Sequence, residues 1–167
     1  MPYPPALTAF LAELPLASLG PGTPIDSARA TLSDASLLTG AAHPDACRAG
    51  LWLAFGFLDE SHAISQELHT PEGSYWHALM HRREPDGANA KYWFRKVGTH
   101  PIYAELARDA AELRYLGMGM AWDPFTFVDH CDEFRDTGTD AEETCKRVQR
   151  REWELLFAWC YGQVEGT

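Results

Sequence analysis

The sequence has few cysteines, no long apolar run and no early basic residues. Its four cysteines form no C-x-x-C pair, which argues against a disulfide framework and favours free thiols in a cytoplasmic protein. The longest apolar stretch lies within residues 51–58, far short of a membrane span. No Lys or Arg precedes Arg29, and Glu13 interrupts the apolar N-terminal run. A secretory signal is therefore not expected.

The common catalytic motifs are also missing. There is no G-x-S-x-G elbow and no Walker A loop, and Gly117-Met118-Gly119-Met120 lacks the third glycine and the preceding strand of a dinucleotide site. Basic residues are scarce as well, because 14 Lys and Arg face 24 Asp and Glu, for a net charge of −10. This charge argues against sequence-independent binding to nucleic acid or to an anionic membrane. A homo-oligomer remains open.

What is present is helical periodicity. The length of 167 residues and the apolar share of 46% fit one packed domain, and no segment shows sustained alternation of apolar and polar residues. We predict an all-α fold, a single compact domain over residues 1–167 with about six to eight helices. Whether residues 1–40 form a peripheral helical extension is left open. The expected helices are 7–14, 26–38, 44–68, 70–83, 88–97, 101–116, 123–134 and 140–159, with 91–97 as the strongest alternative strand.

Helix ends are marked by turn and capping residues. Thr70-Pro71-Glu72 has the pattern of an N-cap followed by the first helical turn. Asp86 and Asp123 precede other helix starts, and Asp140 is expected to cap the last helix. Gly98 is expected just beyond the end of the helix at 88–97.

One short block reverses the acidic trend. Residues 81–100 carry five basic residues against Glu84 and Asp86, and aromatic rings and histidines lie beside them. Guanidinium groups pair with carboxylate or phosphate, and rings supply flat apolar contact. The alternative is that the rings are core and the cations pair with Glu84, Asp86 and acidic residues of the last helix.

The same block resembles a known family. YWHALMHRREPD at 75–86 and NAKYWFR at 89–95 look like the signature of an uncharacterised family of bacterial proteins. LDESH at 58–62 and WELLF at 153–157 are similar to it too. The resemblance covers about the last two-thirds of the chain. It implies no activity, and the cofactor stays unknown.

We predict that this block lines a recess for a small anionic or polar molecule. His77 and His81 would transfer protons in any catalysis. The predicted ligand-binding residues are His62, Arg82, Arg83, Asn89, Lys91, Tyr92, Trp93 and Arg95.

A metal site is the second hypothesis. His77 and His81 are four residues apart, so on a helix their side chains project from one face about 6 Å apart. Such a pair chelates a divalent metal when a third ligand is supplied, here by Glu60, His62 or His100. Ala78 stands where a metalloprotease helix has its general-base Glu. The competing interpretation is that each imidazole hydrogen-bonds a carboxylate or carbonyl. A third hypothesis is a non-catalytic module that binds a protein or nucleic acid.

Overall fold

Prolines and short polar side chains mark where the helices begin. The computed structural model describes residues 3–117, 119 and 121–162. In it, Thr70, Asp86 and Asp123 each accept a backbone N–H at a helix start, as the sequence predicts. Gly98 ends its helix with φ of 65°, a value that suits glycine. The last helix is capped by Thr139, one residue before the predicted Asp140.

The all-α prediction is confirmed, and within the described residues no strand is present. Residues 91–97, the alternative strand, are helical. The described residues form nine α-helices, more than the six to eight expected, together with two short 3-10 turns at Asp26–Ala28 and Ala35–Leu38. The α-helices are α1 (Pro5–Ala12), α2 (Arg29–Ser33), α3 (Pro44–Ala54), α4 (Leu58–Ser65), α5 (Pro71–Arg83), α6 (Gly87–Val97), α7 (Tyr103–Glu112), α8 (Pro124–Phe134) and α9 (Asp140–Tyr161).

The ninth α-helix arises because one predicted helix is broken in two, and a second predicted helix is shortened. The stretch 26–38 becomes α2 flanked by the two 3-10 turns. The long helix expected over 44–68 stops at Gly56, which has φ of 85°. A Cβ atom there would lie 2.8 Å from the carbonyl oxygen of Thr23, so both the backbone conformation and the space require glycine. The break redirects α4, which packs against α5.

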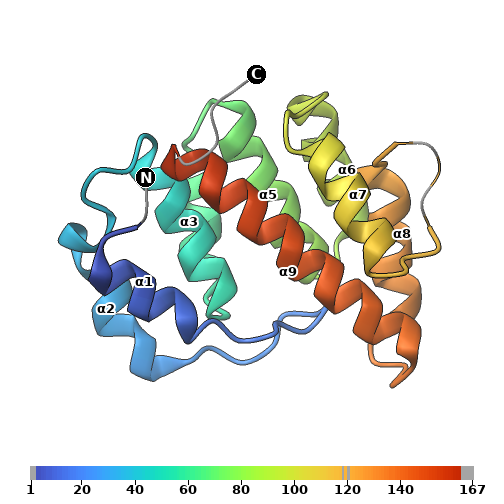
Figure 1. Ribbon diagram of the computed structural model, residues 1–167, viewed down its shortest axis with the longest axis horizontal. Helices are drawn as coiled ribbons and strands as arrows, with labels where there is room; N and C mark the ends of the chain where they lie inside the picture. The colour runs from blue at the N-terminus through green and yellow to red at the C-terminus, as the bar shows by residue number, and fades with distance from the viewer. Residues whose placement is uncertain (1–2, 118, 120, 163–167) are drawn as a thin grey trace.

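The centre of the molecule is built from α3, α5 and α9. Figure 1 shows α9 crossing α3 and α5, with α1 and α2 on one side and α6, α7 and α8 on the other. Every residue of α5 from Gly73 to Arg83 is buried. This burial arises because α4 and α6 both pack against α5.

The N-terminal residues pack onto the bundle. Leu7, Leu19 and Leu32 are almost completely buried, and the Tyr3 ring lies edge-on to Tyr161 with centroids 4.9 Å apart. The chain between α1 and the first 3-10 turn has no regular structure. None of the described helices has the combined length and apolar character needed to cross a bilayer.

Side chains from the bundle hold that irregular segment by its carbonyl groups. Arg150 donates to the carbonyl oxygens of Leu14 and Pro15, and Gln149 donates to that of Ser18, over 3.0 to 3.2 Å. Such bonds satisfy backbone groups that have no secondary-structure partner. Residues 14–21 therefore form a strap, anchored by polar side chains that bind its carbonyl groups and by the fully buried Leu19.

Candidate metal centre

Three histidines converge where α4 meets α5. His62 comes from α4, and His77 and His81 come from successive turns of α5. The ring centroids are 4.7 Å apart for His62 and His77, 5.5 Å for His62 and His81, and 4.9 Å for His77 and His81. One nitrogen atom from each ring lies within 4.8 Å of the others. Among the described residues, this is the one group of three or more such side chains able to share a metal ion.

The structure selects His62 from the three candidate third ligands. Glu60 instead accepts a hydrogen bond from Arg29 over 2.9 Å. His100 is buried elsewhere, with its Nε2 atom 3.9 Å from a carboxylate oxygen of Glu72. The turn at Gly56 brings His62 to its position, because a straight helix over 44–68 would not fold α4 back against α5.

Glu84 orients one of the three imidazoles. The Nδ1 atom of His81 lies 3.0 Å from Oε2 of Glu84. When Nδ1 carries the proton, it donates to the carboxylate, and Nε2 is left with a free lone pair. This carboxylate–histidine arrangement is the one that supports metal-bound histidines in many proteins. For His81, this contact is the imidazole–carboxylate hydrogen bond of the competing interpretation, although the sequence pattern offered Glu84 only as a partner of the basic residues.

His77 is the most enclosed member of the cluster. It is 3% exposed, and its Nδ1 atom is buried without a hydrogen-bond partner among the residues that the structure describes. Burial, followed by the neighbouring charges of His81, His62 and Lys96, lowers the pKa of His77 to about 3. The imidazole is therefore neutral at physiological pH, the form that binds a metal ion.

The residue set fits a borderline-soft divalent ion. Imidazole nitrogen suits zinc, nickel, copper and cobalt, with metal–nitrogen bonds of about 2.0–2.1 Å for zinc. His62 is half-buried, whereas His77 and His81 are buried. The centre therefore lies at the edge of the core, with His62 on its more exposed side.

The basic residues of the block do not gather in one recess. Arg82 is fully buried and forms an ion pair with Glu152 of α9 over 2.7 Å. Tyr75 donates to the other oxygen of the same carboxylate over 2.9 Å. The Arg82 guanidinium also lies 4.7 Å from the ring centroid of Phe127. Arg82 therefore follows the alternative interpretation, in which a cation of the basic block pairs with an acidic residue of the last helix.

Arg83 is buried without any carboxylate partner in the described structure. Its guanidinium donates to the carbonyl oxygens of Gly20, Pro21 and Leu53. Burial, together with the charge of Arg82, lowers the pKa of Arg83 to about 10. This side chain holds the strap and does not reach the histidine cluster.

The predicted ligand residues of α6 also contact separate partners. Lys91 pairs with Asp129 of α8, Asn89 bonds to the capping Asp86, and Arg95 lies 5.9 Å from the ring centroid of Phe125. Only Trp93 contacts the cluster directly. Its ring stacks on His77 with centroids 3.9 Å apart and planes 16° from parallel, and the adjacent Tyr92 ring is 47% exposed.

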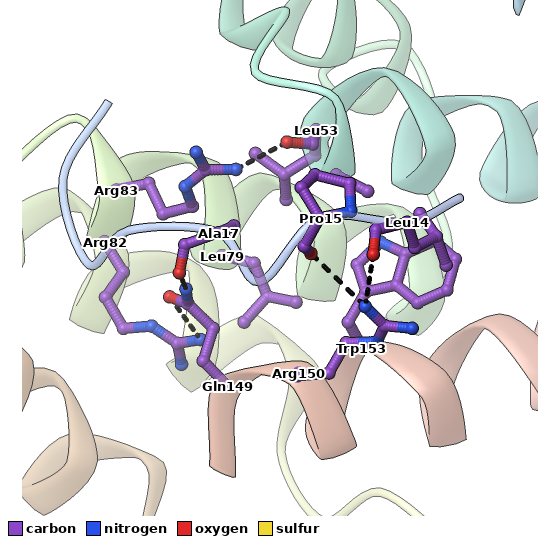
Figure 2. A pocket seen from close by; sticks show the side chains of 11 residues that line it. Leu14, Pro15, Ala17, Leu53, Leu79, Arg82, Arg83, Gln149, Arg150 and Trp153 are labelled. Carbon is purple, nitrogen blue, oxygen red and sulfur yellow. Dashed lines mark hydrogen bonds between the residues drawn. The ribbon is translucent and has the colours of Figure 1, made fainter. Parts of the chain in front are cut away.

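The hollows found among the described residues lie away from the histidines. Figure 2 shows the one beside the strap, lined by Arg82, Arg83, Gln149 and Arg150. It holds about 30 Å³, room for about one water molecule. A wider hollow of about 570 Å³ lies between the α7–α8 connection and α9. There the hydroxyl of Tyr115 lies 2.6 Å from Nδ1 of His130, and neighbouring Cys131 is fully buried.

Comparison with models of known families, with curated proteins and with solved structures finds no match for this chain.

Proposed function

We propose that this chain binds one divalent transition-metal ion through His62, His77 and His81. The observation that carries the proposal is the convergence of three imidazole nitrogen atoms from two helices within 4.8 Å. Three protein ligands are fewer than zinc takes in a closed structural site. An ion held in this way supplies Lewis-acid activation of a substrate oxygen or a water molecule.

The chain's own residues would prepare the site. Glu84 holds the His81 ring in place through Nδ1, and Trp93 covers one face of His77. A fixed ring loses less conformational entropy on binding than a mobile one. The four cysteines are free and buried, and they fit a reducing compartment such as the cytoplasm.

The test is metal titration of protein purified without a histidine tag and stripped with chelator. Zinc measured by calorimetry, and cobalt measured by its visible absorption, should each bind at about one equivalent per chain. The change His62→Ala should lower the affinity by more than about 100-fold. The matched control is His69→Ala, since His69 is an exposed histidine nearby in the sequence. Sub-stoichiometric binding, or equal affinity of the His62 variant and the wild type, would overturn the proposal.

The second candidate is a small anionic or polar ligand bound without a metal, with His77 or His81 transferring a proton. The stacking of Trp93 on His77 favours a flat or charged ligand near α6. Arg82 and Arg83 are buried with internal partners, so neither is available to that ligand, to an acidic protein or to nucleic acid. Binding of phosphate to the chelator-treated protein, at low salt by calorimetry, tests this alternative.

A further inference from the structure

A bound divalent ion would leave the histidine centre with a large positive charge. The three imidazoles are neutral ligands, so they leave the charge of the ion intact. Of the nearby acids, Glu84 is hydrogen-bonded to His81 and Glu60 is paired with Arg29. Asp86 accepts hydrogen bonds from Asn89 at the start of α6. A centre of this kind favours an anionic ligand at its open position.

Lys96 adds a second cation on the α6 side of the centre. Its Nζ atom lies 4.3 Å from the ring centroid of Trp93 and 4.8 Å from that of Tyr92. Trp93 in turn stacks on His77, so the indole ring of Trp93 contacts both the ammonium group of Lys96 and a proposed metal ligand.

Lys96 differs from the other lysine of α6. Lys91 forms an ion pair with Asp129 across to α8, whereas Lys96 is exposed and forms no ion pair with any acid in the part of the chain that the structure describes. An exposed ammonium resting on two aromatic faces is held in place by cation–π attraction while its charge stays available.

We propose that the metal centre takes a small oxyanion, the carboxylate or phosphate group of a small molecule, at its open position, and that Lys96 contributes to its binding. This inference rests on the proposed metal site and names the class of ligand that the site accepts. Sequence reasoning singled out Lys91 and Arg95 of this helix for an anion and passed over Lys96, because the stacking of Trp93 on His77 is not visible in the sequence.

The test uses the cobalt-loaded protein and two probes, acetate and inorganic phosphate. Each is titrated while the visible absorption of cobalt is recorded, because replacement of a cobalt ligand changes that spectrum. Saturable change with either probe is expected, and the stronger response identifies the favoured oxyanion. The change Lys96→Met, which keeps the apolar stem, should weaken anion binding by about 3- to 10-fold and flatten its salt dependence. The change Lys91→Met should leave the affinity within about 2-fold, because Lys91 is paired elsewhere.

The two proposals fail in different ways. If cobalt does not bind, both are overturned. If cobalt binds at one equivalent and neither anion changes its spectrum, the metal site stands and the oxyanion inference is wrong. Equal losses in the Lys96 and Lys91 variants would show that only overall charge matters, and this result would also overturn the assignment to Lys96.

Discussion

Helix α5 carries two polar clusters that differ in how their charges are matched. Arg82 and Arg83, at its C-terminal end, have a buried carboxylate or backbone carbonyls as partners. His77 and His81, on the same helix, face His62 and leave a buried ring nitrogen without a partner. Arg82 also keeps two buried nitrogen atoms, Nε and Nη1, without a partner among the described residues, but Glu152 matches its charge. The histidine cluster is the better candidate for a ligand site because three of its nitrogen atoms converge within 4.8 Å. The arginine cluster stabilises the fold.

Removing the partner of Arg82 gives the largest effect expected from this contrast. The change Glu152→Ala should lower the free energy of unfolding by about 3–5 kcal/mol, because it leaves a fully buried guanidinium without a counter-charge. Urea denaturation measures this loss. The milder change Glu152→Gln keeps the shape and serves if the alanine variant does not fold. Metal affinity of the folded Gln variant should stay within about 2-fold, and a loss below about 1 kcal/mol in both variants would contradict the structural role.

A histidine outside the cluster tests the pH dependence of stability. Burial lowers the pKa of His100 to about 4, against the opposing charge of Glu72; Tyr75 and Tyr103 face it as well. Because the unfolded chain takes up this proton first, the contribution of His100 is present above about pH 6.5 and is lost as the pH falls toward about 4. The loss should amount to as much as about 3 kcal/mol.

The change His100→Gln isolates that contribution. Stability of this variant, measured by urea denaturation between pH 7 and pH 4, should fall less steeply than that of the wild type. The variant His69→Gln, at an exposed position, should follow the wild-type curve. Parallel curves for the wild type and the His100 variant would show that His100 is not the titrating group.

The smallest effect concerns the carboxylate behind the cluster. The change Glu84→Gln should lower metal affinity by about 10- to 100-fold, because the amide no longer fixes the proton on Nδ1 of His81. The change Glu84→Asp should recover part of the affinity. Glu84 is exposed, so stability without metal should change by less than about 0.5 kcal/mol. Unchanged metal affinity would remove Glu84 from the site.

Local features of the fold could be predicted from the sequence. Thr70, Asp86 and Gly98 act within one turn of their own positions, so their patterns define helix ends directly. The pairing of His77 with His81 follows from helical spacing alone. The helix break at Gly56 could not be predicted from the sequence, because the close approach that requires glycine there involves Thr23, a residue of a different segment.

Long-range partners could not be predicted in this way. The partner of Arg82 is 70 residues away in the sequence, and any acid of the last helix satisfied the pattern equally well. In the sequence, His62 is one of three candidate third metal ligands. The turn after α3, which brings it next to His77, is not visible there. The sequence predicts that the basic block forms one wall of a recess. Clustering of basic residues along a sequence does not specify where each side chain points, however, and in the structure these cations have separate partners.

The strap has a consequence for how the chain can be shortened. Arg83 sits on the central helix, yet two of its three acceptors belong to Gly20 and Pro21. A fragment beginning after the strap would leave that guanidinium enclosed with a single carbonyl acceptor, and it would also uncover the apolar surface beneath Leu19. The strap thus supplies hydrogen-bond acceptors and apolar cover to the central helix α5, and a stable truncated form should retain residues 14–21.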